Sequence, residues 1–399
     1  FSSNYAQAFG KLVTPLVQGI RVRGPFGPRF TNEEFNLVLI DGQGIGHAPD
    51  AASTVSTHIT SRYGEADVIL LVDNAEQPML APSVAFIRSV LASGHQRKLV
   101  LGLTHFDRLE GPNLRSIDQK RAHVLEAVTG AVDSLKETLG ATLVNGFEEE
   151  LANRCYMLGW LDRPITERSR GPVKGMERLL AFSRDSLLPE PLFEATPIYD
   201  PAGLLFAVQA ATDEFHNLWN ARLGYSFRSG VDKEHWARVK ALNRRVALSI
   251  DVEYLHLQPV AELIARLSEQ IAKFLNEPVR WGGPPADDRE REQVIARVRR
   301  TVFSSLHALV EARIVNHPRP SWVDAYSYRG HRSTFERARE IRSIYEEAAP
   351  IPGPAMTKSV AEFLDEVRRL VHSAIIEAGG ELESAVPVTE KGHALSSAG

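Results

Sequence analysis

Three short polar segments follow runs of apolar residues in the first half of this sequence. They are Asp41-Gly42-Gln43-Gly44, Thr104-His105-Phe106-Asp107 and Gly159-Trp160-Leu161-Asp162. Continuous apolar runs of this length are typical of strands buried on both faces, as in a parallel sheet that helices cover. Because open sheets of this kind bind ligands beyond the carboxyl ends of their strands, we expect the three segments to lie together around a ligand.

The first segment has the chemistry to meet a cation or a phosphate. Asp41 ends the apolar run that begins at Phe35, so its carboxylate is placed to bind rather than to pack. Gly42 and Gly44 free the backbone after it, which allows main-chain N–H groups to turn towards an anion. The simpler alternative is that Asp41 caps the helix that follows.

Alternating strands and helices are predicted to position these segments. Strands are expected at residues 16–23, 35–41, 66–73, 98–104 and 154–160, of which the first two form a hairpin. Helices are expected at residues 2–12, 51–63, 82–92, 116–139 and 173–187. This alternation with short connections is typical of a doubly wound α/β sheet.

The pattern changes at Pro189-Glu190-Pro191, beyond which no convincing strand is found. Apolar residues follow helical spacing around residues 204–219, 263–275, 294–310 and 360–371. The predicted fold class is therefore α/β followed by all-α. Its domains are an α/β domain over residues 1–188, a helical bundle for effector or assembly contacts over 189–378, and a disordered tail over 379–399.

Composition narrows the class of protein. The 399 residues include 43% hydrophobic and 24% charged residues, as in an ordinary globular chain, and the net charge of -4 argues against a general nucleic-acid binder. The single cysteine, Cys155, stands in an apolar run and is expected to be a buried packing residue. A reducing, cytoplasmic location is the expectation. The sequence begins at Phe1, and we expect it to be a fragment that lacks its true N-terminus.

The order of these motifs resembles the nucleotide-binding core of P-loop GTPases, in the group that includes the dynamin-like and translation-factor GTPases. The resemblance covers about residues 1–187 and implies GTP or GDP with Mg²⁺ as ligands. It implies that Asp41 holds Mg²⁺ through a water and that the N–H of Gly44 binds the γ-phosphate. Thr14 matches the threonine that serves both. Thr104, His105 and Asp107 match the base-binding motif, in which Asp107 accepts guanine N1–H and N2–H.

Departures from the family's pattern are as informative as the matches. The phosphate-cradling Gly-x-x-x-x-Gly-Lys-Ser/Thr is absent, so the resemblance implies a sheet that lacks its first strand and a chain that binds nucleotide poorly as given. His105 replaces the usual lysine, and its imidazole could stack on the base instead. Ile45 stands where many small GTPases carry a glutamine that orients the attacking water. Gln43, His47 or a group from a partner would then have to serve hydrolysis.

Two other functions stay open beside a GTP-hydrolysing switch. One is a scaffold or interaction protein that keeps the fold without the activity, and the other is an ATPase of the same superfamily. Asp107 could also cap its own turn, and His47 could be an ordinary exposed loop residue. The expected partner is a protein or a second copy of the chain, through the helical domain. Nucleic acid is not expected, membrane contact has no support in the sequence, and no His-Glu-x-x-His or Cys/His pairing indicates zinc.

Overall fold

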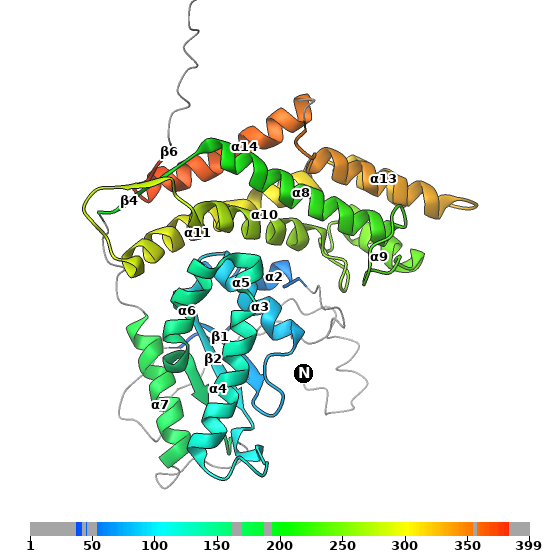
Figure 1. Cartoon of the computed structure of the whole chain (residues 1–399). Coiled ribbons are helices and arrows are strands. Elements are labelled where there is room, and N and C mark those ends of the chain that lie inside the picture. Colours follow the sequence, from blue (N-terminus) through cyan, green and yellow to red (C-terminus); the bar gives the residue numbers. More distant parts are fainter. Residues whose placement is uncertain are drawn as a thin grey trace, which may run out of the picture.

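The computed structural model describes residues 37–41, 45, 54–161, 170–186, 194–353 and 357–382. Two units are visible in Figure 1: an α/β unit over residues 54–186 below, and a helical unit over residues 194–382 above it. Helices make up most of the regular structure in both units. None of the helices in the described ranges has the length and apolar character needed to cross a membrane.

The α/β unit is built on a parallel sheet of three strands in the order β1-β2-β3. They are β1 (Ile69–Asn74), β2 (Leu99–Thr104) and β3 (Cys155–Met157). β2 is the central strand and is buried along almost its whole length, as its run of apolar residues predicts. In this register Asn74 of β1 stands beside Thr104 of β2, so the strands end at the same edge.

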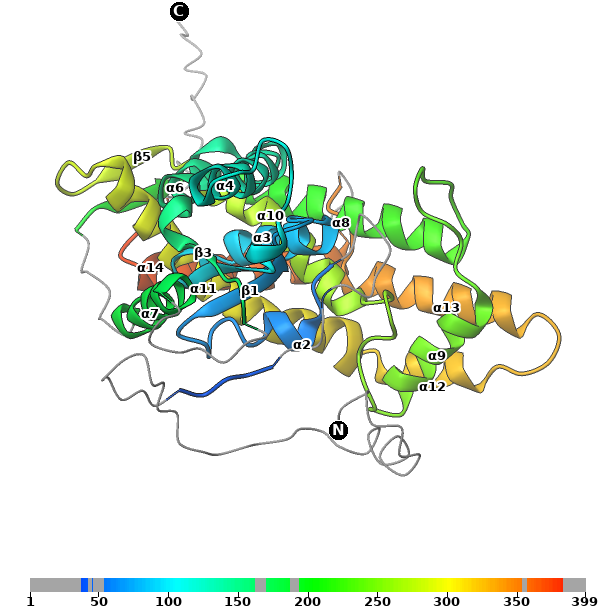
Figure 2. The ribbon, with the colours of Figure 1, turned by 90° about the horizontal axis from the view of Figure 1, so that it is seen from below.

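Helices cover both faces of this sheet (Figures 1 and 2). The helices of the unit are α2 (Thr57–Thr60), α3 (Ala81–Ala92), α4 (Ile117–Asp133), α5 (Lys136–Leu139), α6 (Ala141–Arg154) and α7 (Arg170–Asp185). α4 begins at a capping box, in which Ser116 accepts from the N–H of Gln119 while the Gln119 side chain accepts from the N–H of Ser116. α7 lies on the opposite face from α3, α4 and α6, where Leu179 packs with Val100 and Tyr156.

The helical unit contains seven α-helices among the described residues. They are α8 (Pro201–Leu223), α9 (Trp236–Ala247), α10 (Pro259–Asn276), α11 (Asp288–Glu311), α12 (Arg319–Ser327), α13 (Ser333–Ala348) and α14 (Lys358–Glu377). α8 shows how sequence sets its ends: Asp200 caps its start, Pro201 opens it, and Gly224 ends it with a left-handed φ of 82°.

The prediction of an all-helical second part is wrong in one detail. Three short strands form a small mixed sheet in the order β5-β4-β6. They are β4 (Thr196–Tyr199), β5 (Arg280–Gly282) and β6 (Glu381–Leu382). Each has two to four residues, too short for an alternating pattern to be recognised in the sequence.

Two predictions for the first part also need correction, and one helix was missed. Residues 37–41 form no strand, and Val38 and Leu39 are 87% and 84% exposed rather than buried. The helix expected at 51–63 is described only as the short α2, and the helix α6 was not predicted at all. A run of apolar residues makes a buried strand only when neighbouring strands accept its backbone, which the sequence of the run itself cannot show.

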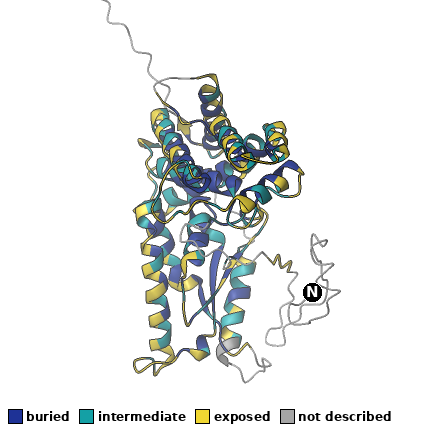
Figure 3. Cartoon of the chain, turned by 90° about the vertical axis from the view of Figure 1, so that its right-hand side faces the viewer, coloured by how far each residue is buried: buried dark blue, intermediate teal, exposed yellow. Residues whose placement is uncertain are grey.

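The two units share one hydrophobic core, and we call the contact between the α/β unit and helices α10 and α11 the seam. Tyr63 stacks on Phe303 with ring centroids 6.0 Å apart, and His95 packs edge-on against the same ring. All three side chains are buried. Figure 3 shows this burial as dark blue where the units meet. The seam therefore packs like a protein interior rather than a loose domain contact.

Candidate functional site

The turn that carries Asp107 follows the carboxyl end of β2. β2 ends at Thr104, and His105 turns the chain with a left-handed φ of 56° into a single 3₁₀ turn, Phe106–Arg108. Phe106 is buried and anchors this turn to the core. Asp107 is therefore held at the end of the central strand, while the His105 side chain is exposed.

The segment after β3 reaches this turn directly. Oδ1 of Asp107 accepts the main-chain N–H of Trp160 at 2.9 Å. A Cβ at position 159 would lie 3.0 Å from both the main-chain nitrogen and Oδ1 of Asp107, so Gly159 permits this close approach. The structure thus brings together two of the three polar segments that the sequence singled out.

A second strand-end carboxylate has a different role. Asp73 accepts the N–H of Asn74 at 2.8 Å through Oδ1 and the N–H of Met79 at 2.9 Å through Oδ2. Met79 has a left-handed φ of 61°, so Asp73 stabilises a tight loop after β1. The Thr104 hydroxyl donates to the main-chain oxygen of Asp73 at 2.9 Å, which ties the ends of β1 and β2 together. For Asp73 and Thr104 these contacts are structural.

Asp107 keeps acceptor capacity beyond its contact with Trp160. Oδ1 is used by Trp160, and within the described residues Oδ2 has no hydrogen-bond partner. A carboxylate has about four acceptor positions, so donors such as guanine N1–H and N2–H can still be accommodated. Trp160 is 39% exposed and Leu161 is 45% exposed. The segment that donates to Asp107 through the N–H of Trp160 therefore carries exposed apolar side chains.

The other predicted residues are not part of this cluster. Asp41 is exposed, and no hydrogen bond or ion pair joins it to another described residue. Thr14, Gln43, Gly44 and His47 lie outside the described residues. Ile45 is half-buried and packs against the core, which is a packing role and not that of a water-orienting group.

Metal chemistry has no further support from this geometry. Within the described ranges no three His, Cys, Asp or Glu side chains come close enough to hold a metal ion. Cys155 is 1% exposed, and burial raises the pKa of its thiol to about 12. The prediction that it is a packing residue is confirmed, because a thiol with this pKa stays protonated and unreactive at neutral pH.

Neither family models, nor curated proteins, nor solved structures match this chain. What the site does must therefore follow from its own residues.

The contact between Asp107 and Trp160 was not predicted from the sequence, because it uses a main-chain group. The signal for it in the sequence was a glycine directly after an apolar run.

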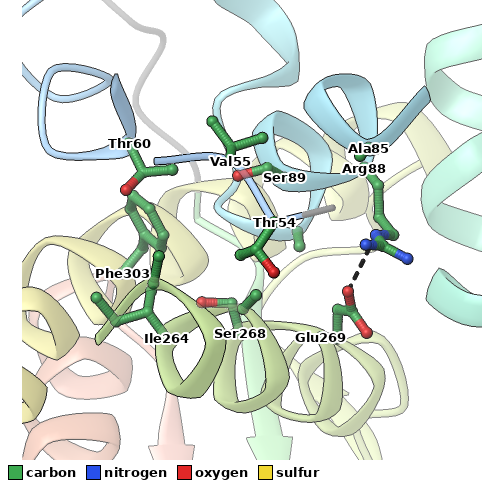
Figure 4. Close-up of a pocket in the computed structure, with 13 residues that line it drawn as sticks. Thr54, Val55, Thr60, Ala85, Arg88, Ser89, Ile264, Ser268, Glu269 and Phe303 are labelled. Atoms are coloured by element: carbon green, nitrogen blue, oxygen red, sulfur yellow. Dashed lines mark ion pairs between the residues drawn. The ribbon is translucent and has the colours of Figure 1, made fainter. Parts of the chain in front are cut away.

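A small cavity in the seam offers no alternative ligand site. The segment from Thr54 to Thr60 and helices α3, α10 and α11 line it (Figure 4). Its water-accessible volume is about 20 Å³, enough for one water molecule and far below the size of a nucleotide pocket. Arg88 of α3 pairs with Glu269 of α10 at 3.1 Å beside it, so the cavity belongs to the joint between the units.

Proposed function

We propose that this chain belongs to a guanine-nucleotide-binding switch that hydrolyses GTP and passes its nucleotide state to the helical unit. In this proposal Asp107 accepts the paired donors of the guanine base, and His105 and Trp160 cover the base. Asp41 and Gly44 serve the metal and the γ-phosphate, together with Thr14. Gln43 and His47 are the candidates for orienting the attacking water.

The observation that carries the proposal is the position of Asp107. It stands after the central strand of a parallel sheet, at the edge where such sheets bind ligands, and is bonded to the segment that follows the next strand. A carboxylate that only capped its own turn would need no contact with Trp160. Among the described residues Oδ2 of Asp107 has no hydrogen-bond partner, which leaves acceptor positions for a base.

Magnesium is the least supported part of the proposal. Mg²⁺ would neutralise the charge that develops on the phosphates. Among the described residues Asp41 is a single exposed carboxylate, and these residues alone do not fit a bound Mg²⁺. A metal site therefore stays a prediction that rests on Asp41 and Thr14.

Base recognition can be tested by equilibrium titration of the complete gene product. Fluorescent GTP, GDP and ATP are titrated in the presence of Mg²⁺. We expect micromolar or tighter guanine binding and at least about 100-fold weaker binding after Asp107→Ala, because two charge-assisted hydrogen bonds are lost. Asp107→Asn should shift preference to xanthine nucleotides, whose 2-carbonyl accepts where guanine donates. Asp118→Asn, an exposed change at the start of α4, is the matched control.

The second candidate is a scaffold that keeps the fold without the activity. It is favoured by the packing role of Ile45. If the folded wild-type protein binds none of the three nucleotides, the switch is excluded and the scaffold is the better account. Adenine binding that survives Asp107→Ala would instead favour the ATPase alternative.

A further inference from the structure

Helix α9 buries one face and leaves the opposite face in solvent. Its buried side chains Val239, Leu242 and Val246 recur at helical spacing and belong to the shared core, on the side where α9 packs on α12 (Figure 2). The exposed side carries a row of side chains spaced four residues apart, namely Trp236, Lys240, Arg244 and Leu248. We call these four residues the α9 row.

Apolar side chains stand at both ends of the α9 row. Trp236 is 50% exposed and Leu248 is 51% exposed. An α-helix rises by about 18 Å between positions this far apart, so the two side chains cannot cover each other. Tryptophan is among the residues most enriched at the energetic centres of protein interfaces. The row therefore offers two separate apolar contacts.

The middle of the α9 row carries two cations without a partner. The sequence of α9 contains basic residues and no acidic one. Arg238 and Arg245 each lie 3.3 Å from a carboxylate oxygen of a neighbouring loop. Lys240 and Arg244 form no ion pair with another described side chain. These two positive charges, about one helical turn apart, are left for a partner.

The loop between α9 and α10 adds exposed apolar side chains near the Leu248 end of the row. Ile250 is 59% exposed and Leu255 is 63% exposed. Tyr254 and Leu257 exchange main-chain hydrogen bonds of 2.9 Å, and Leu255 in this tight turn has a left-handed φ of 55°. Asparagine and glycine are the usual residues at such a position, so the turn itself does not account for a leucine.

Contacts on two sides hold this loop in place. The guanidinium of Arg245 in α9 lies 5.1 Å from the ring centroid of Tyr254, which sets the turn against the end of the helix. On the other side, Glu253 accepts the main-chain N–H of Thr57 at 2.7 Å. Side chains that are already fixed lose less conformational entropy on binding. The exposed surface of α9 and its loop is therefore pre-formed.

We propose that the α9 row is a docking surface for an acidic amphipathic helix of a partner protein. Two carboxylates four residues apart on the partner meet Lys240 and Arg244, and apolar side chains four residues beyond each carboxylate meet Trp236 and Leu248. Rows of this spacing align when two helices cross at about 50°, which is the commonest packing angle. This contact needs no nucleotide and goes beyond the proposed function.

The α9 row fits a protein helix better than a membrane or a nucleic acid. A helix that lies on a membrane inserts an apolar face, but the apolar face of α9 is already in the core. Nucleic-acid surfaces meet many phosphates, whereas this row offers two unpaired cations in a chain of net charge -4. Charge complementarity thus favours an acidic protein segment.

Two labelled helical peptides test the proposal by fluorescence anisotropy with the complete gene product. The acidic peptide carries a leucine, two glutamates and a leucine at four-residue spacing in an alanine and glutamine background, and the basic peptide has lysines in place of the glutamates. We expect the acidic peptide to bind at least about tenfold tighter, and its binding to weaken as salt rises. The double variant Lys240→Glu with Arg244→Glu should reverse this preference.

Reversal of the preference is a result that a purely structural role of these side chains would not produce. Arg368→Glu with Arg369→Glu makes the same change of charge at exposed sites of α14 and should leave both titrations as in the wild type. Trp236→Ala keeps the charges and should weaken the acidic peptide at least about fivefold.

Three results would overturn the proposal. Equal binding of the two peptides by the wild type, or binding of neither, would mean that the row does not select an acidic helix. Without acidic-peptide binding, sedimentation with vesicles of about 30% anionic lipid that the double variant loses would identify a membrane surface. A dimer of the wild type that the same variant dissociates would identify a second copy of the chain as the occupant.

Discussion

The two ends of the parallel sheet differ in what surrounds them. At the amino ends of the strands, Tyr63, His95 and Phe303 are buried against one another in the seam. At the carboxyl ends, His105 and Trp160 are exposed and both have left-handed backbone. In Figure 1 the strands point away from the helical unit, so the sheet itself separates the two ends.

The two ends of the sheet therefore differ in what they can bind. The packed end joins the units and has room for little more than a water, whereas the open end presents an acceptor and apolar surface that a ligand can cover. If the packed end is committed to stability and the open end is free for binding, variants at the two ends should differ in their effects.

The largest effect is expected for Gly94→Ala in the seam. Gly94 has a φ of 75°, and a Cβ there would lie 2.5 Å from the main-chain oxygen of Ala296 in α11. Backbone strain and the clash together should lower the free energy of unfolding by at least about 3 kcal/mol. Denaturant titration measures it. Gly130→Ala in α4, where a Cβ meets nothing within 4 Å, should instead be neutral or stabilising by up to about 1 kcal/mol.

A smaller loss of stability is expected on mild acidification. Burial, with help from Lys98 and Arg300, lowers the pKa of His95 to about 3. Because an unfolded histidine titrates near pH 6.5, the unfolded chain gains a proton below that pH and the native protein does not until about pH 3. Lowering the pH from 7 to 5 should therefore reduce the free energy of unfolding by about 2 kcal/mol for this group.

Thermal or urea unfolding across that pH range checks the sign. His95→Phe keeps an aromatic ring against Tyr63 and Phe303 and removes the titrating group, so its stability should depend less on pH. Some dependence will remain, because burial also lowers the pKa of His307 to about 4. An unchanged pH dependence in His95→Phe would mean that the seam admits water around this ring.

The sequence predicted those strands and helices that have a regular hydrophobic pattern or a clear end signal. β1, β2 and α3 lie within a few residues of their expected positions, because long apolar runs and a helix-opening proline are strong local signals. Residues 37–41 show the limit: the same kind of run stays exposed, because pairing depends on other parts of the chain. α6 was missed because it begins at Ala141, directly after α5, and Gly140 before it has no capping side chain.

The candidate site was also predictable from the sequence only in part. The position of Asp107 after a buried strand could be predicted from the sequence, since apolar runs followed by polar residues mark strand ends. Its bond to the N–H of Trp160 could not, because every residue has such a group and only the fold selects one. The contact between Glu253 and Thr57 could not be predicted for a similar reason. Glu253 lies 196 residues from Thr57, in a loop without a recognisable motif.

The smallest predicted effects compare the two strand-end aspartates. Both oxygens of Asp73 bind main-chain N–H groups of its own loop, whereas Asp107 uses one oxygen for Trp160. We expect Asp73→Ala to lower the free energy of unfolding by about 1.5 kcal/mol and Asp107→Ala by about 1 kcal/mol or less, since both sites are half-exposed and water replaces part of each bond. Urea unfolding without nucleotide measures both.

Adding nucleotide sharpens this comparison. A bound ligand stabilises the native state in proportion to the logarithm of its concentration over Kd, so GTP should raise the stability of Asp73→Ala but not that of Asp107→Ala. Equal stabilisation of both variants would place the base elsewhere than at Asp107. Greater loss of stability for Asp107→Ala than for Asp73→Ala, in the absence of nucleotide, would show that the carboxylate at the open end is committed to the fold rather than kept for a ligand.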